Sequence, residues 1–118
     1  MGTTGTVMGV SRYLREVAPT VRVIGVEPYL GHKIQGLKNM KESYTPGIFE
    51  KPRADRIINV EDDEAYHTAR LLARKEAIFV GMSSGAAMAI ALKLVALKGQ
   101  WLPYASLGNA MRMSRFEA

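Results

Sequence analysis

The chain has 118 residues, of which 47% are hydrophobic and 23% charged, and this composition fits one small globular domain with a modest core. It has no cysteine and no metal-ligand spacing between its two histidines, so we expect neither a disulfide framework nor a metal site. The net charge of +5 is spread along the sequence without a basic run, which disfavours nucleic-acid binding. No signal peptide or membrane span is visible, and we expect a cytoplasmic protein.

The sequence opens on a glycine- and threonine-rich turn placed directly before a predicted amphipathic helix, residues 6–18, which Pro19 ends. The turn consists of Gly2, Thr3, Thr4, Gly5 and Thr6, and the apolar face of the helix of Val7, Val10, Leu14 and Val17. Glycines allow close backbone approach, and the first helix amides lack internal partners and carry partial positive charge. The turn is therefore a candidate phosphate cradle, although a plain helix cap explains it equally well.

The middle of the chain contains two predicted strands separated by a long loop. Residues 21–26 are short, β-branched and mostly apolar, as expected of a buried parallel strand, and residues 56–60 form the second strand. Glycines and prolines punctuate residues 29–55, which we expect to be mainly loop, with room for a short helix near residues 33–37. A loop of this length in a compact chain is usually functional.

A second glycine-rich turn follows in the last third of the sequence. Acidic residues at 62 and 63 favour the start of a helix that runs to about Lys75, and residues 77–80 read as a short strand. The turn Gly81-Met82-Ser83-Ser84-Gly85 then opens an alanine-rich helix that runs to Lys98. Its predicted core positions are Ala86, Ala87, Ile90, Leu94 and Leu97. The alternation predicts an α/β fold with parallel strands, whose ligand site lies at the carboxyl ends of the strands.

Four segments stand in the order and spacing of cysteine synthases, namely residues 2–6, 23–28, 46–49 and 81–86. Over residues 1 to about 98 the sequence resembles these O-acetylserine sulfhydrylases, which belong to the tryptophan-synthase-β-like, fold type II, pyridoxal-phosphate enzymes. Thr4 and the Pro-Gly-Ile-Phe segment look most like the cysteine synthase B branch. The resemblance implies a partial pyridoxal-phosphate-binding α/β domain over residues 1–98 and a divergent tail over residues 99–118.

The resemblance also implies pyridoxal 5'-phosphate as cofactor and assigns roles to individual residues. The cofactor phosphate would be held by Gly2, Thr3, Thr4, Gly5 and Thr6, and the pyridine nitrogen by the Ser83 hydroxyl. A serine leaves that nitrogen neutral, which suits β-elimination, although an N-cap role also explains Ser83. Some B-branch members carry two arginines where this sequence has Lys38 and Asn39, so Lys38 is a candidate for substrate binding or simply an exposed loop lysine.

The implied activity is the replacement of the acetoxy group of O-acetylserine by sulfide or another sulfur nucleophile, giving L-cysteine. In the family, the Schiff-base lysine and the loop for the substrate carboxylate lie upstream of the glycine-threonine turn. No catalytic residue is therefore assigned, and we expect this chain alone to be inactive. The alternatives are a non-catalytic remnant that keeps a phosphate-binding half-site and an unrelated phosphate-binding module. We also expect a homodimer or association with another chain, because missing strands would expose one side of the sheet.

Overall fold

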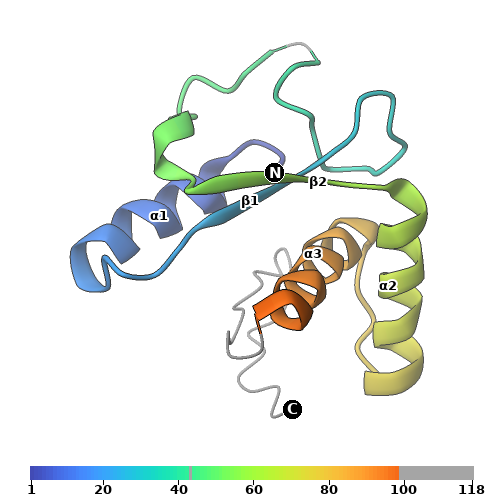
Figure 1. Ribbon diagram of the computed structural model, residues 1–118. Helices are drawn as coiled ribbons and strands as arrows, with labels where there is room; N and C mark the ends of the chain where they lie inside the picture. The colour runs from blue at the N-terminus through green and yellow to red at the C-terminus, as the bar shows by residue number, and fades with distance from the viewer. Residues whose placement is uncertain (43, 99–118) are drawn as a thin grey trace.

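Two parallel strands lie at the centre of the computed structural model, which describes residues 1–42 and 44–98 (Figure 1). Strand β1 (Ile24–Pro28) pairs with β2 (Arg56–Val60), from Ile24 opposite Arg56 to Pro28 opposite Val60. The strand predicted at 56–60 is confirmed. The first strand begins three residues later than predicted, because the Val21 amide still donates to the Ala18 carbonyl oxygen (3.0 Å) in the turn that follows the first helix.

Helix α1 (Gly5–Val17) confirms the predicted first helix within one residue at each end. It ends where the Ala18 amide donates to the Leu14 carbonyl oxygen (2.8 Å), directly before Pro19. The Asp55 carboxylate accepts hydrogen bonds from the Arg15 guanidinium (2.6 Å) and from the Val23 amide (2.6 Å). Asp55 therefore ties the last turn of α1 to the residues that begin both strands.

Helix α2 (Asp62–Glu76) follows the carboxyl end of β2, and α3 (Met82–Lys98) packs closely against α2 and lies against one face of the two strands (Figure 1). Acidic residues occupy the first turn of α2 and basic residues its last, in accord with the helix dipole. A Cβ on Gly85 would overlap the carbonyl oxygen of Ala65 and lie 2.9 Å from the Cβ of Ala69. Only glycine therefore allows this approach. The buried core between the pair and the strands consists of Ile34, Val60, Ala65, Ala86, Ala89 and Ile90.

The strand predicted at residues 77–80 is wrong, because this segment pairs with no other strand in the described part of the chain. Ala77 adopts a left-handed conformation (φ 55°) that ends α2, and the next residues run back along α2 toward α3 (Figure 1). Ile78 and Val80 pack on Leu72, Met88 and Ala91, whereas Phe79 is 93% exposed. This apolar segment instead forms an extended connection between two helices.

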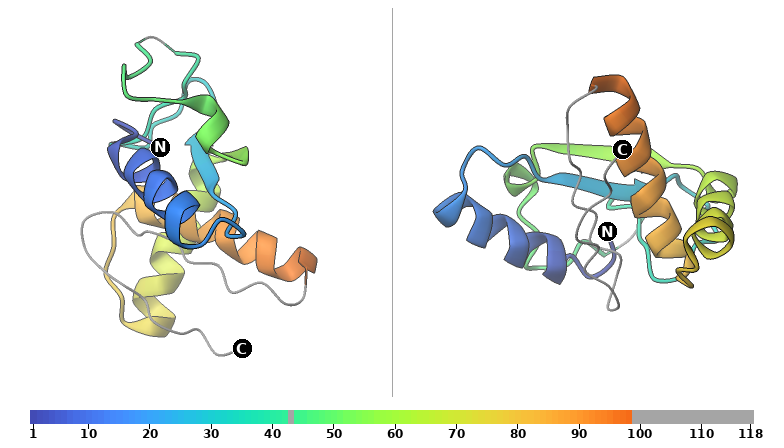
Figure 2. Two further views of the ribbon diagram at one scale, coloured as in Figure 1. Left: turned by 90° about the vertical axis from the view of Figure 1, so that its left-hand side faces the viewer. Right: turned by 90° about the horizontal axis from the view of Figure 1, so that it is seen from below.

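The end of α3 is also less buried than predicted. Ala86 and Ile90 lie in the core and Ala87 and Leu94 are half-buried, but Leu97 is 80% exposed. On α1, Val10 and Val17 of the predicted apolar face are exposed as well. Figure 2 explains the difference for α1, which lies beside one end of the strands, away from α2 and α3.

The predicted loop is confirmed over most of residues 29–55, with one short 3-10 helix, η1 (Lys51–Arg53). The helix considered near residues 33–37 does not form. Ile34 anchors the first part of the loop in the core. Glu50 ties the second part to α1 by an ion pair with Arg12 (2.6 Å) and also pairs locally with Arg53 (2.7 Å). The predicted tail at residues 99–118 lies outside the described residues.

Candidate cofactor site

The glycine-threonine loop begins alongside the carboxyl half of β1. The Met1 amino group donates to the carbonyl oxygen of Val26, and the Lys38 amide donates to the carbonyl oxygen of Met1 (2.8 Å). A Cβ on Gly2 would overlap the carbonyl oxygen of Gly36, so the two backbones touch at this glycine. These contacts place the start of the loop at the sheet edge where parallel α/β folds bind ligands.

Thr4 is buried in an unusual state within this loop. Thr4 is only 3% exposed, and its hydroxyl oxygen has no hydrogen-bond partner among the described residues. Its backbone is left-handed (φ 65°, ψ −2°), a conformation that β-branched residues rarely adopt, and its side chain does not cap α1. A strained backbone and an unpartnered buried hydroxyl both cost free energy and commonly mark ligand sites. The Thr4 hydroxyl is thus free to bind an oxygen of a ligand.

The amino end of α1 is open to an anion. Among residues 1–42 and 44–98, the amides of Gly5 and Thr6 donate to no protein acceptor, because the first internal bond of the helix joins the Met8 amide to the Thr4 carbonyl oxygen (2.9 Å). The first turn of α1 contains no acidic residue, in contrast to that of α2. Free amides, a positive helix end and the Thr4 hydroxyl together fit a phosphate group.

Ser83 lies in the first turn of α3, at the second glycine-rich turn. The Gly81 carbonyl oxygen accepts hydrogen bonds from the amides of Ser84 and Gly85 (3.1 Å each), which fixes this helix start. Ser84 is buried, whereas Ser83 is only half-buried, and its hydroxyl bonds to none of the described residues. No described contact joins Ser83 to the loop of Gly2 to Thr6. A cavity shared by the two turns stays a prediction.

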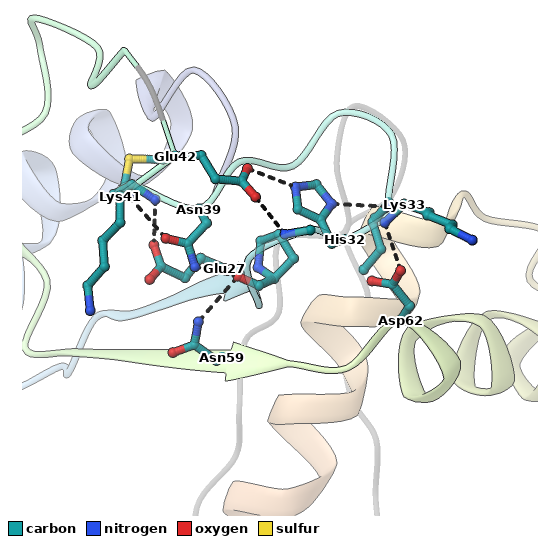
Figure 3. A network of polar contacts seen from close by, with 12 residues as sticks. Glu27, His32, Lys33, Asn39, Lys41, Glu42, Asn59 and Asp62 are labelled. Carbon is teal, nitrogen blue, oxygen red and sulfur yellow. Dashed lines mark hydrogen bonds and ion pairs between the residues drawn. The ribbon is translucent and has the colours of Figure 1, made fainter.

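A network of polar contacts holds the long loop over the carboxyl ends of the strands (Figure 3). Asn39 and Asn59 both donate to the carbonyl oxygen of Pro28, at 2.8 and 3.2 Å. Buried Glu27 accepts a hydrogen bond from the Met40 amide (3.1 Å). Farther along, His32 pairs with Glu42 (3.4 Å). Lys38 is exposed beside this network. Its backbone amide contacts the start of the predicted cofactor loop, and its side chain faces solvent.

Asn39 and Glu27 are buried polar residues whose roles sequence reasoning missed. Asn39 entered the prediction only as the position of a missing arginine, yet it is 5% exposed and bonded at both ends of its amide. Its partners lie on β1 and on the neighbouring loop, so no local sequence signal separates it from a solvent-exposed loop asparagine. A left-handed glycine, Gly36 (φ 82°), lies three residues before Asn39 in the same loop.

A separate hollow of about 520 Å³ lies between residues 29–32 and residues 61–64. None of the predicted cofactor residues lines it, and four consecutive carboxylates at the start of α2 make it unfavourable for a phosphate. The described residues hold no cluster of three metal-binding side chains. None of the helices in the same ranges is both long and apolar enough to cross a membrane.

The parallel strands and the glycine-rich turns before two helices define an α/β protein of the parallel-sheet class. Residues 1–101 match the family model for pyridoxal-phosphate dependent enzymes, and the chain belongs to this family. It is 48% identical to cysteine synthase B of Pseudomonas aeruginosa over 94 residues, which are 80% of this chain and 31% of that protein. It is 49% identical to a cysteine synthase of Aquifex aeolicus over 104 residues, 85% of this chain and 32% of that protein.

The fold of this chain is also similar to solved structures of related enzymes. The crystal structure of an O-ureido-L-serine synthase superposes with a TM-score of 0.75 at 36% identity, covering 83% of this chain and 33% of that one. The partial fold type II architecture and the resemblance to the cysteine synthase B branch are thereby confirmed. The chain spans about a third of the length of the curated relatives that it matches.

Proposed function

We propose that residues 1–98 hold pyridoxal 5'-phosphate in a cysteine synthase, which replaces the acetoxy group of O-acetylserine by a sulfur nucleophile. The observation that carries the proposal is the buried, unpartnered Thr4 hydroxyl at the open amino end of α1. Membership in the pyridoxal-phosphate dependent family supports this ligand over other phosphates. The same family membership argues against the alternative of an unrelated phosphate-binding module.

In this proposal, the loop of Gly2 to Thr6 binds the cofactor phosphate. The free amides of Gly5 and Thr6 donate to phosphate oxygens, the Thr4 hydroxyl donates a further hydrogen bond, and the dipole of α1 stabilises the negative charge. Contact between Gly2 and the Gly36 carbonyl oxygen keeps the loop backbone in place. No carboxylate lies in the first turn of α1 to oppose the anion.

Ser83 would orient the other end of the cofactor. When bound, pyridoxal phosphate supplies an electron-withdrawing ring that stabilises charge at the α-carbon of the substrate. A hydroxyl at its pyridine nitrogen leaves this nitrogen neutral, whereas a carboxylate would keep it protonated. The half-buried Ser83 hydroxyl bonds to no described residue and is available for this contact. Lys38, with an exposed ammonium group next to the loop, would attract the anionic substrate.

A chimera tests the proposal directly. The 94 matching residues of the Pseudomonas aeruginosa cysteine synthase B are replaced by the corresponding segment of this chain, and cysteine formation from O-acetylserine and sulfide is measured. We expect turnover with bound pyridoxal phosphate. In the chimera, Ser83→Ala should lower kcat by about 10- to 100-fold with the cofactor still bound, because one polar contact to the reacting ring is lost.

A matched control is Ser84→Ala, which removes the neighbouring hydroxyl from the same helix turn and should leave kcat within about twofold. A folded chimera that binds the cofactor but forms no cysteine would contradict the proposed activity. A chimera in which Ser84→Ala is the damaging change would show that the roles of the two serines are reversed.

A further inference from the structure

The loop of Gly2 to Thr6 rests against a second loop, residues 36–42, which we call the clamp loop. Two backbone contacts join them: the Lys38 amide donates to the Met1 carbonyl oxygen (2.8 Å), and the Gly36 carbonyl oxygen touches Gly2. The clamp loop has no regular secondary structure of its own. Side-chain hydrogen bonds of Asn39 and Glu27 attach it to β1.

Asn39 makes the central attachment of the clamp loop. Its Nδ2 donates to the Pro28 carbonyl oxygen (2.8 Å) at the end of β1, and its Oδ1 accepts from the Lys41 amide (3.0 Å). Because one partner is a carbonyl and the other an N–H, both contacts require the same orientation of the amide. The residue is 5% exposed, so water cannot easily replace these bonds. Figure 3 shows the Asn39 amide directed at the end of β1.

We propose that Asn39 is a positioning residue for the phosphate-binding loop: it fixes the clamp loop to β1, and the clamp loop fixes Met1 and Gly2. The inference rests on the proposed function of the Gly2 to Thr6 loop. Asn39 lies directly after Lys38, whose amide makes the contact to Met1. Removal of the Asn39 amide releases this contact and lets the amides of Gly5 and Thr6 leave the geometry that suits an anion.

Asn59 provides a matched control. Its Nδ2 donates to the same Pro28 carbonyl oxygen (3.2 Å), but from β2, and no described contact joins it to the clamp loop. Truncating either asparagine to alanine removes one hydrogen bond to the same acceptor. The two variants differ in what else they remove. Only Asn39→Ala takes away an attachment of the clamp loop to β1 and leaves the Glu27–Met40 hydrogen bond (3.1 Å) to hold it.

The experiment uses the 118-residue chain with inorganic phosphate as the probe. The dissociation constant is measured from NMR shifts of the Gly5 and Thr6 amides in the wild type, Asn39→Ala and Asn59→Ala, with far-ultraviolet circular dichroism as the check of folding. We expect Asn39→Ala to weaken phosphate binding about tenfold and Asn59→Ala by less than about twofold. Hydrogen exchange of the Lys38 amide should accelerate in Asn39→Ala alone.

Different results would overturn the positioning role of Asn39 and the phosphate site itself. Equal affinities for phosphate in Asn39→Ala and Asn59→Ala, or equal acceleration of all amides, would overturn the positioning role, because global destabilisation would then explain the result. A wild type whose Gly5 and Thr6 amides do not respond to phosphate would overturn the proposed phosphate site itself.

Discussion

Thr4 combines backbone strain with a useful hydroxyl, and the two can be separated by mutation. Thr4→Gly removes the penalty of a left-handed β-branched residue, about 1–2 kcal/mol. It loses a buried methyl group worth about 0.8 kcal/mol and adds the backbone-entropy cost of glycine, about 0.5–1 kcal/mol. These terms nearly offset, so we expect the free energy of unfolding to change by less than about 1 kcal/mol. Phosphate affinity should nevertheless fall, because the hydroxyl is lost. Urea unfolding and phosphate titration measure the two effects.

Thr3→Gly is the control for this variant, because Thr3 is exposed and is not among the residues with positive φ. It should destabilise the chain by about 0.5–1 kcal/mol through backbone entropy, without relief of strain. If Thr4→Gly destabilises the chain more than Thr3→Gly does, the left-handed conformation of Thr4 is not strained.

Gly85 illustrates a residue that the sequence motif explains only in part. It belongs to the Ser-Ser-Gly turn, yet its position is fixed by the packing of α3 on α2. Gly85→Ala would place a methyl group against the Ala65 carbonyl oxygen and within 2.9 Å of Ala69, and we expect a loss of about 1–3 kcal/mol of stability. Thermal and urea unfolding provide the measurement.

Gly9→Ala is the matched control in α1, where nothing lies within 4 Å of the added Cβ. It should stabilise the chain by about 0.5–1 kcal/mol, because alanine favours the helix more than glycine does. Opposite signs for the two glycine substitutions are the expected result, and equal stability changes would contradict the close helix contact at Gly85.

Asp55 joins α1 to the two strands and makes their junction sensitive to acid. The hydrogen bond from the Val23 amide, followed by that from Arg15, lowers the pKa of the Asp55 carboxyl below its ordinary value. A lowered folded-state pKa adds stability that is present above the unfolded pKa of about 3.9 and is lost as the pH falls through the folded value. Asp55→Asn should therefore destabilise the chain at pH 7 by about 1 kcal/mol, with the difference shrinking below about pH 4.

Unfolding curves of the wild type and Asp55→Asn, recorded between pH 7 and pH 3, test this junction. A difference between the two proteins that stays constant over this range would show that the charge of Asp55 contributes nothing to it.

Elements with strong local signals could be predicted from the sequence, and those that depend on distant partners could not. Helix α1 and strand β2 follow from periodicity and β-branching, and their bounds agree with the structure. The segment 77–80 is short and apolar like a buried strand but has no neighbouring strand to pair with in the described chain. The two glycine-rich turns identify Thr4 and Ser83 as candidate site residues from the sequence. The φ angle of Thr4 and the burial of Asn39 could not be predicted, because they arise from tertiary contacts.

The exposed apolar face of α1 bears on the assembly of the whole chain. Val10 and Val17 are 39% and 56% exposed, and Tyr13 beside them is 63% exposed. We expect the chain to associate through this face, because water disfavours a contiguous apolar stripe. The double variant Val10→Glu, Val17→Glu should shift the mass measured by light scattering toward that of one chain.

Thr20→Glu adds a negative charge in the exposed turn after α1 without removing apolar area and should leave the measured mass unchanged. A wild-type chain that stays monomeric at about 100 μM would contradict association through α1.

The central claim is that the loop of Gly2 to Thr6 binds the cofactor phosphate while Ser83 holds the ring nitrogen. A crystal structure of the 118-residue chain with pyridoxal phosphate tests it most directly. The account predicts phosphate oxygens within hydrogen-bond distance of the Thr4 hydroxyl and the Gly5 and Thr6 amides, with the pyridine nitrogen at the Ser83 hydroxyl. A cofactor phosphate bound elsewhere, with the Thr4 hydroxyl still unpartnered, would contradict it.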